Sequence, residues 1–363
     1  MSQLKVNTIR HTGASSDAIT LAADGTAALG ECTAKITNNL SNRNLVINGA
    51  MNVAQRSASS TADGYQTVDR FKAAAGGNDN VLTQAQHALT SSDTGPYELG
   101  FRKSLHITNG DQSSGAGAAD YFEIQYNIEA QDLANSGWNY TSTSSYITLS
   151  FWAQASVAQT YYVYLQTTDG TAQTYSFSFA LSANTWTKVT KTIPGAANIT
   201  FDDNTDHGLR IGIVPFYGTN YTNNKTADTW AAHDGSNYFP DQTSTWWTTD
   251  DATFEITGVQ LTTTDYCPDY PHVSYAEDLR RCQRYYWQNL KNVYLFQYGE
   301  THKRIEIYFP VPMRTTPTYD HTGSSITIDS GTHQSEEFFC AYSASDYDGP
   351  GRNYSSVKFN AEI

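Results

Sequence analysis

The sequence predicts an all-β fold, a jelly-roll β-sandwich, and three observations support this prediction. In most periodic segments apolar residues alternate with polar ones, which is the spacing of a half-buried strand. Turn signals such as Asp169-Gly170, Pro194-Gly195 and Asp234-Gly235 separate these segments. Only 16% of the 363 residues are charged, against about 25% in an average soluble protein. Short strands joined by polar turns are typical of antiparallel sandwiches and jelly rolls.

The first part of the chain, residues 1–40, differs from the rest. Its residues are mostly small and polar, with brief apolar pairs such as Ile19 and Leu21 near the Asp24-Gly25 turn. So few apolar groups do not offset the entropy of ordering, and the stretch therefore cannot build a core alone. We expect an extended N-terminal arm that attaches to a partner surface, and a disordered tail is the alternative.

The predicted sandwich covers residues 41–264. Its alternating segments are residues 122–128, 147–151, 161–165, 175–179, 209–213 and 254–261. In the last segment the apolar face switches between Ile256 and Val259. Gly258 lies at the switch, where a β-bulge is the expected cause.

A linker with one helix follows at residues 265–290. Within residues 274–290, apolar side chains recur at helical spacing, namely Tyr275, Leu279, Cys282 and Tyr286. Ser274 can cap this helix, and Glu277 stands three residues further on, as a capping box requires. We expect a connector helix packed on a sheet. Residues 291–363 then predict a small C-terminal β domain, with strands near residues 305–309, 326–328, 338–342 and 357–359.

Charge and cysteine content limit the possible partners. The chain carries 22 Lys+Arg against 36 Asp+Glu, a net charge of −14. Because nucleic-acid affinity comes mainly from cations that neutralise phosphates, we expect no nucleic-acid partner. No apolar stretch approaches the ~20 residues of a membrane helix, and no signal peptide is recognisable. We therefore expect synthesis in the cytoplasm, no membrane insertion and no secretion. The four cysteines lack a C-x-x-C pair, which favours buried reduced thiols, and they are Cys32, Cys267, Cys282 and Cys340.

No motif in the sequence identifies an enzyme. A G-x-S-x-G elbow, an H-E-x-x-H pair and a Walker loop are all missing from the sequence. The nine histidines show no ligand-like spacing, so we expect them to be surface or structural residues. We therefore expect no catalytic residue and no cofactor other than a calcium ion.

Calcium is the one metal that the sequence suggests. Asp202, Asp203 and Asp206 form an acidic cluster, and Asp250-Asp251 is a second acidic position. Either could hold calcium in a loop, because hard cations bind several carboxylate, amide and carbonyl oxygens. The spacing does not match an EF-hand, and solvated turns show the same pattern, so both interpretations stay open.

Aromatic residues are densest between positions 216 and 247, among Gly, Asn, Thr and Asp. Flat rings beside amides and hydroxyls suit sugars, whose C–H faces stack while their hydroxyls form hydrogen bonds. The alternative is that these rings fill the core or a subunit interface, where Tyr and Trp are also enriched. The candidate glycan-binding residues are Tyr217, Tyr221, Trp230, Tyr238, Trp246 and Trp247.

Several motifs resemble a family of tailed-phage virion proteins, usually tail fibres or fibre-like adhesins. The first are NLVINGAMNVAQR at residues 44–56 and YQTVDRF at residues 65–71. Further matches follow in the family's order: NIEAQDL and LSFWA resemble its middle strands, WTKVTKTIP and ITGVQL its later strands, and SYAEDLRRCQRYY and FPVPMRTTPTY its C-terminal part. The N-terminal MSQLKVNTIRHTG and ITLAADGTA are similar to the starts of fibre proteins in phages of marine bacteria. The resemblance covers most of the chain.

This resemblance implies a virion component with a jelly-roll module like a carbohydrate-binding domain. It implies a trimer that is mounted on other virion proteins by its N-terminal arm and that attaches to a host-surface glycan. Without a signal peptide, lysis of an infected host would be one route out of the cell. One departure is TTTDYCPDYPHV at residues 262–273, where family members usually carry a Glu and a Thr-Pro-Phe-Glu stretch. Two other functions stay open: a purely structural tail or capsid appendage, and a polysaccharide depolymerase, which requires two carboxylates in a groove.

Overall fold

The computed structural model describes residues 8–9, 13, 19–21, 27–29, 44–223, 225–289, 293–294, 296–298, 302–322, 333–343, 353–354 and 356–363. The chain divides into two compact units, Met1–Leu40 and Ser41–Ile363. In the first unit, β1 (Thr8–Ile9), β2 (Ile19–Leu21) and β3 (Ala27–Leu29) form an antiparallel sheet in that order. An attachment role for this unit stays a prediction.

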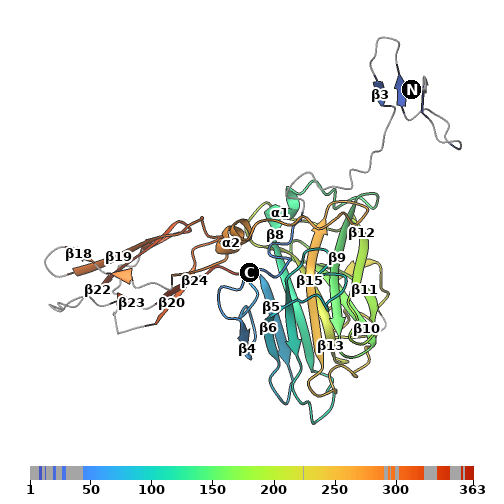
Figure 1. Cartoon of the computed structure of the whole chain (residues 1–363), viewed down its shortest axis with the longest axis horizontal. Helices are drawn as coiled ribbons and strands as arrows, with labels where there is room; N and C mark the ends of the chain where they lie inside the picture. Colours follow the sequence, from blue (N-terminus) through green and yellow to red (C-terminus); the bar gives the residue numbers. More distant parts are fainter. Residues whose placement is uncertain are drawn as a thin grey trace. The chain divides into compact units, whose positions relative to one another are not determined.

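The second unit contains two six-stranded antiparallel sheets (Figure 1). The sheet that we call the β8 sheet has the order β14 (Trp230–Ala232), β11 (Gln173–Leu181), β10 (Gln159–Thr167), β13 (His207–Tyr217), β8 (Tyr121–Glu129), β5 (Phe71–Gly76). The β15 sheet has the order β12 (Thr187–Pro194), β9 (Tyr146–Ala155), β15 (Thr253–Thr262), β7 (Lys103–Thr108), β6 (Thr83–Ala88), β4 (Ser59–Ser60). Neighbours in space are far apart in sequence, as β15 between β9 and β7 illustrates. This arrangement confirms the predicted all-β jelly-roll sandwich.

The core lies between the two sheets, and it is filled by the apolar side chains that occupy every second position of the strands. In β8, the apolar side chains Phe122, Ile124, Tyr126 and Ile128 are at most 2% exposed. The predicted bulge in β15 is confirmed, because the pairing of β15 with β9 shifts register between Thr257 and Gln260. Gly258 lies in this shift with a φ of +63°, and a Cβ there would meet the ring of Phe101 at 2.7 Å. Only glycine fits that backbone and that space.

The linker helix α2 (Tyr275–Gln283) is shorter than predicted. Its start is as expected, since the Ser274 hydroxyl accepts a hydrogen bond from the Glu277 amide at 3.3 Å. The predicted extension to residue 290 is wrong, because residues from Tyr286 onwards form a strand, β16 (Tyr286–Asn289). Tertiary contacts of the aromatic side chains in β16 override the helical spacing there. Tyr275 is 57% exposed, so it does not belong to the apolar stripe.

A second, five-residue helix was not predicted. It is α1 (Ala130–Ala134), which follows β8 directly, so the motif NIEAQDL ends its strand at Glu129 and turns into a helix. In the part of the chain that the structure describes, no helix is long and apolar enough to cross a membrane.

The C-terminal part forms small sheets with their own core. The first has the order β16, β24 (Ser356–Asn360), β20 (Thr318–Thr322), the second β18 (Phe296–Tyr298), β19 (His302–Tyr308), β22 (Phe338–Ser343), β21 (His333–Gln334), and the third β17 (Val293–Tyr294), β23 (Asn353–Tyr354). The buried side chains of this core include Ile307, Met313, Phe339, Val357 and Phe359. Three of the predicted strands are confirmed, and the one at residues 326–328 lies outside the described residues.

Three of the four cysteines lie in the described part of the chain. Cys282 and Cys340 are buried free thiols, as predicted, and Cys267 is a half-buried one. Cys32 lies outside the described residues.

Candidate functional site

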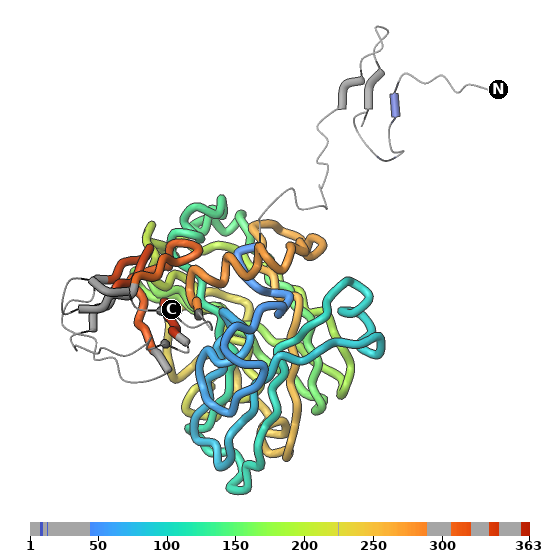
Figure 2. The backbone as a smooth tube through the Cα atoms, turned by 60° about the vertical axis from the view of Figure 1, so that its left-hand side comes forward, coloured from blue at the N-terminus to red at the C-terminus, as the bar shows by residue number. Residues whose placement is uncertain are grey.

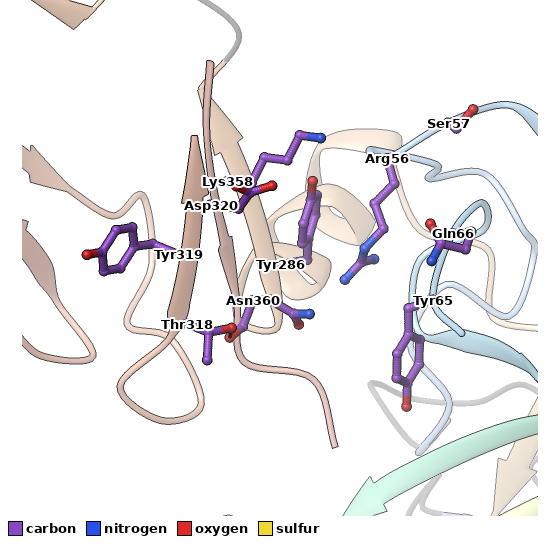
Figure 3. Close-up of a pocket in the computed structure, with 10 residues that line it drawn as sticks. All are labelled: Arg56, Ser57, Tyr65, Gln66, Tyr286, Thr318, Tyr319, Asp320, Lys358 and Asn360. Atoms are coloured by element: carbon purple, nitrogen blue, oxygen red, sulfur yellow. Dashed lines mark hydrogen bonds between the residues drawn. The ribbon is translucent and has the colours of Figure 1, made fainter. Parts of the chain in front are cut away.

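A surface pocket with a cavity volume of about 450 Å³ lies between residues 56–66 and the sheet of β16, β24 and β20 (Figure 3). Its lining combines aromatic rings with polar and charged groups. The lining residues are Tyr65, Tyr286 and Tyr319, the charged Arg56, Asp320 and Lys358, and the neutral polar Ser57, Gln66, Thr318 and Asn360. We call it the tyrosine–arginine pocket.

One wall of the pocket is set by strand register. Asn360 in β24 lies opposite both Tyr286 and Thr318, and two residues earlier Lys358 lies opposite Asp320. Since residues two apart in a strand share a face, these rows present their side chains on the same side of the sheet. Tyr319 lies between the rows in sequence, and Figure 3 shows it pointing away from the other labelled side chains.

The opposite wall is Arg56, which is stacked rather than free. Its guanidinium carbon lies 3.6 Å from the centroid of the Tyr286 ring and 5.8 Å from that of Tyr65. Its nitrogens also lie 3.3 Å from Glu362 Oε1 and 3.6 Å from Asp69 Oδ1. The charge of Arg56 is therefore already paired, and the pocket wall is held from two sides.

Arg56 is placed by hydrogen bonds between the two motifs at residues 44–56 and 65–71. The Asn48 amide donates to the carbonyls of Val53 at 2.9 Å and Asp69 at 3.0 Å. The Asp69 carboxylate in turn accepts from the backbone amide of Gln55 at 3.0 Å. The loop that ends in Arg56 is thus fixed to the turn before β5.

Below the pocket lies a buried network that joins the sandwich to the C-terminal part, which we call the junction. Its members are Asp69, Arg70, Glu129, Arg284, Tyr285 and Glu362. Arg70 is 1% exposed; it pairs with Glu362, donates to the Asn127 carbonyl at 2.7 Å and lies 3.4 Å above the Tyr285 ring.

The second half of the junction is centred on Glu129, at the end of β8. Arg284 binds its two carboxylate oxygens at 2.9 and 2.8 Å, and the Tyr285 hydroxyl donates to it at 2.5 Å. The last residue of the chain also lies here, since the Asn127 amide donates to the Ile363 carbonyl at 2.5 Å. Figure 2 shows this C-terminus beside the first, blue part of the sandwich. Three of the motifs singled out in the sequence, at residues 65–71, 127–133 and 274–286, therefore meet at the junction.

Burial perturbs the titration of the junction. It raises the pKa of Asp69 from 3.8 to about 6, against the opposing effects of Arg56 and the hydrogen bonds from Gln55. Burial acts in the same direction on Glu129, but hydrogen bonds from Arg284 and Tyr285 outweigh it and lower its pKa. Burial alone would lower the pKa of Arg70, but the Glu362 carboxylate and neighbouring tyrosines outweigh it and raise this pKa well above its ordinary value.

The predicted glycan residues fall into three separate places. Tyr217, Tyr221 and Tyr238 lie together on the outer face of the β8 sheet, where their ring centroids are 5.2 Å (217–221) and 5.4 Å (217–238) apart. We call them, with Tyr164, the tyrosine cluster. Trp230 lies elsewhere, at the edge of that sheet, with its indole NH donating to the Pro194 carbonyl at 2.7 Å.

The two remaining candidates are core residues. Trp246 and Trp247 are both 0% exposed. The Trp246 NH donates to the Thr253 carbonyl at 3.0 Å, and the Trp247 ring stacks on Phe216 at 5.3 Å. Their faces are covered by protein, so we remove both from the glycan-binding set. The alternative reading of the aromatic region, core filling, describes these two.

The tyrosine cluster covers a buried carboxylate. Glu123, 5% exposed, accepts from the Tyr164 hydroxyl and the Gln125 amide, both at 2.5 Å. Tyr221 and Tyr238 are half-buried, whereas Tyr217 is 5% exposed. A smaller hollow of about 200 Å³ lies beside the cluster, next to Tyr217 and Gln242.

The acidic cluster does not converge on one point. Asp202, Asp203 and Asp206 are exposed, and Asp203 accepts from the Asn135 amide at 2.8 Å. Among the described residues, a single group has three His, Cys, Asp or Glu ligand atoms within 4.8 Å of one another, and it contains none of these aspartates. The structure therefore gives no support to a calcium site built from these three carboxylates.

That single group is His87, His106 and Glu255, which the sequence analysis missed. Each is a polar residue at an outward position of a strand, in β6, β7 and β15. The alternation marks each one as outward-facing, but only the register places Glu255 opposite His106. The Ser104 hydroxyl donates to the Glu255 carboxylate at 2.7 Å, unlike the serine of a hydrolase triad, which donates to a histidine.

Comparisons with known proteins identify no family. No family model matches the sequence, and no curated protein matches it. Solved structures with some likeness include the N-terminal cellulose-binding domain of Cellulomonas fimi β-1,4-glucanase C, at 16% identity and TM-score 0.29, covering 59% of this chain and 100% of that one. The family 11 carbohydrate-binding module of Clostridium thermocellum Lic26A-Cel5E has 10% identity and TM-score 0.27, with 57% and 95% covered. TmCBM61 in complex with β-1,4-galactotriose has 9% identity and TM-score 0.28, with 61% and 100% covered. Such low TM-scores carry no functional conclusion, and the fold assignment rests on the strand order.

Proposed function

We propose that this protein is a non-enzymatic glycan-binding protein of a phage virion, a tail fibre or fibre-like appendage that attaches to a host surface through the tyrosine–arginine pocket. The observation that carries this proposal is the lining of the pocket. Its volume of about 450 Å³ falls within the range of ordinary small-molecule sites. The rings of Tyr65 and Tyr286 beside hydroxyl and amide groups suit the two kinds of surface that a sugar presents.

The charges of the pocket favour a neutral glycan. Arg56 is paired with Glu362 and Asp69, and Lys358 lies opposite Asp320. The chain as a whole carries a net charge of −14, so long-range attraction to an anionic surface is not expected. Recognition therefore depends on short-range stacking and hydrogen bonds to hydroxyl groups.

A hydrolytic role is the weaker alternative. Asp320 is the only carboxylate among the ten residues that line the pocket. Glycoside hydrolases use a pair of carboxylates on either side of the scissile bond. Release of reducing ends from host polysaccharide by the purified protein would establish a depolymerase instead.

The assignment to a virion rests on the ordered set of phage-like motifs. We propose that the protein forms a trimer, that the unit Met1–Leu40 attaches to other virion proteins, and that the second unit is displayed outward. Light scattering on the purified full chain tests the trimer directly. A monomeric mass at micromolar concentration would contradict it.

A glycan array with the full chain tests the binding proposal, with folding of every variant checked by thermal unfolding. Gln66→Ala and Lys358→Ala remove polar groups from the pocket, and we expect at least tenfold weaker binding of the captured glycan. Lys191→Ala is the matched control, because Lys191 pairs with Asp228 on another surface. The absence of any bound glycan would favour the purely structural appendage.

The tyrosine cluster is the second candidate, because it presents half-buried rings above a buried carboxylate. Tyr221→Ala and Tyr238→Ala discriminate between the two sites on the same array. Loss of binding in these variants, with Lys358→Ala unaffected, would move the glycan site to the outer face of the β8 sheet.

A further inference from the structure

Three strands of the β15 sheet bring two imidazoles and one carboxylate together on its outer face. Glu255 lies opposite His106, and His87 lies opposite Ser104, the residue two positions before His106. Because Ser104 is small, the side chains of His87 and Glu255 approach each other across it from the flanking strands. No residue of this group lines the tyrosine–arginine pocket.

The distances within the group are short. His106 Nδ1 lies 2.7 Å from Glu255 Oε1, and His87 Nδ1 lies 3.3 Å from Glu255 Oε2. The two imidazole ring centroids are 5.2 Å apart. One ligand atom from each of the three residues lies within 4.8 Å of the other two.

One of these contacts is poorly explained by a hydrogen bond. His106 Nδ1 is buried and has no hydrogen-bond partner with acceptable geometry, although Glu255 Oε1 lies 2.7 Å away. The other ring nitrogen, Nε2, lies 3.1 Å from the Thr108 hydroxyl. If Nε2 carries the proton for that hydroxyl, Nδ1 directs a lone pair at a carboxylate. A cation bound by both atoms from one side resolves that repulsion.

We propose that His87, His106 and Glu255 bind a divalent transition-metal ion, with zinc as the first choice. Imidazole nitrogen and carboxylate oxygen are zinc ligands at about 2.0–2.2 Å. With two nitrogens and a single carboxylate, the group lacks the several oxygens that calcium and magnesium require. Three protein ligands leave a fourth position for water.

The surroundings match those of metal ligands in proteins. The Ser104 hydroxyl holds Glu255 at 2.7 Å, and the Thr108 hydroxyl orients His106 through its second nitrogen. Such outer contacts fix the tautomer and direction of a ligand. His87 has a side chain that is 53% exposed, so the ion would have access from solvent, and it would tie β6 to β15 across β7.

Titration of the untagged full chain with Zn²⁺ and Co²⁺ tests this proposal, by calorimetry and by the visible spectrum of bound Co²⁺. We expect one ion per chain, intense bands of low-coordinate Co²⁺, and a metal-dependent rise in melting temperature. His106→Gln and Glu255→Gln are expected to weaken binding at least 100-fold. Ser104→Ala removes only the support of Glu255 and is expected to weaken binding about tenfold.

Two further variants keep the test decisive. His87→Gln changes an exposed side chain and should leave the fold intact, yet it should abolish the bands. His272→Gln is the control, because this exposed histidine lies outside the group, and its binding should match that of the wild type. A wild type without saturable one-to-one binding, or a His87→Gln variant that binds as the wild type does, would overturn the proposal.

Discussion

Two places in the second unit bring carboxylates against nitrogen-bearing side chains, and they differ in burial. In the junction, the side chains of Arg70 and Glu362 are 1% and 4% exposed, and every charge has several partners. In the group on the outer face of the β15 sheet, Glu255 is also buried, at 7% exposed, but the His87 side chain is 53% exposed. A buried charge is costly unless it is fully paired, so the junction cannot exchange its partners. The group of His87, His106 and Glu255, which we call the open group, can exchange its partners. The junction is therefore structural, whereas the open group is available to a ligand.

Removal of Arg70 is expected to have the largest effect. Arg70→Ala leaves the buried Glu362 with Arg56, at 3.3 Å, as its remaining cation and empties the space above the Tyr285 ring. Breaking such a buried pair typically costs about 3–5 kcal/mol, which we expect as the loss in the free energy of unfolding by urea. Arg102→Ala is the control, because Arg102 stacks on Tyr97 at an exposed site and should cost less than about 1 kcal/mol. Equal losses in both variants would remove the distinction between buried and open sites.

The junction is also expected to impose a pH dependence through Asp69. Its pKa is about 6 in the folded chain, above its ordinary value of 3.8, so the folded state binds more protons between these pH values. The free energy of unfolding should therefore fall as the pH rises from about 4 to about 6, by roughly 3 kcal/mol at most.

Asp69→Asn should flatten the stability curve in that window. Glu129 acts in the opposite sense, because its pKa is lowered. Its stabilising contribution is present above its ordinary value of 4.5 and is lost as the pH falls through its lowered pKa, so that part of the curve should persist in the variant. An unchanged slope between pH 4 and pH 6 in Asp69→Asn would show that another group titrates there.

The Tyr285 hydroxyl tests a single contact of the junction. Tyr285→Phe keeps the ring on which Arg70 stacks and removes the hydrogen bond to Glu129 at 2.5 Å. Buried hydrogen bonds to charged groups contribute about 1.5–3 kcal/mol, and we expect a loss near the lower value because Arg284 remains. Tyr286→Phe is the matched control, since its hydroxyl bonds to the neutral Gln288 amide at 3.1 Å. Urea unfolding should show the smaller loss for the control, and the reverse order would count against the role of Glu129.

Some features of the fold and of these two places could be predicted from the sequence, and others could not. Alternation is a local signal, so it located the core strands, and the face switch at Gly258 located the bulge in β15. The end of α2 depends on Tyr286 packing against Arg56, a residue 230 positions earlier, and helical spacing carries no information on such a contact. Trp246 and Trp247 show the same limit, because density of aromatic residues does not distinguish a core from a binding surface.

The open group was missed for a related reason. His87, His106 and Glu255 lie on strands whose order is β6, β7, β15, so they become neighbours only through a crossover of the jelly roll. Their spacing in sequence resembles that of no metal motif. The only signal of this group in the sequence is the presence of His, Ser and Glu at outward positions of three separate strands. The pairing register of the strands is needed to recognise that these residues are neighbours.

Removal of His87 is expected to have the smallest effect and thus completes the comparison. With chelator present, His87→Gln should change the free energy of unfolding by less than about 0.5 kcal/mol, because exposed substitutions away from special contacts rarely do more. With zinc in excess, the wild type should gain stability in proportion to the logarithm of the zinc concentration, and the variant should not. Thermal unfolding at a series of zinc concentrations measures both. A large loss already in chelator would place His87 with the structural residues of the junction rather than with an open, ligand-ready surface.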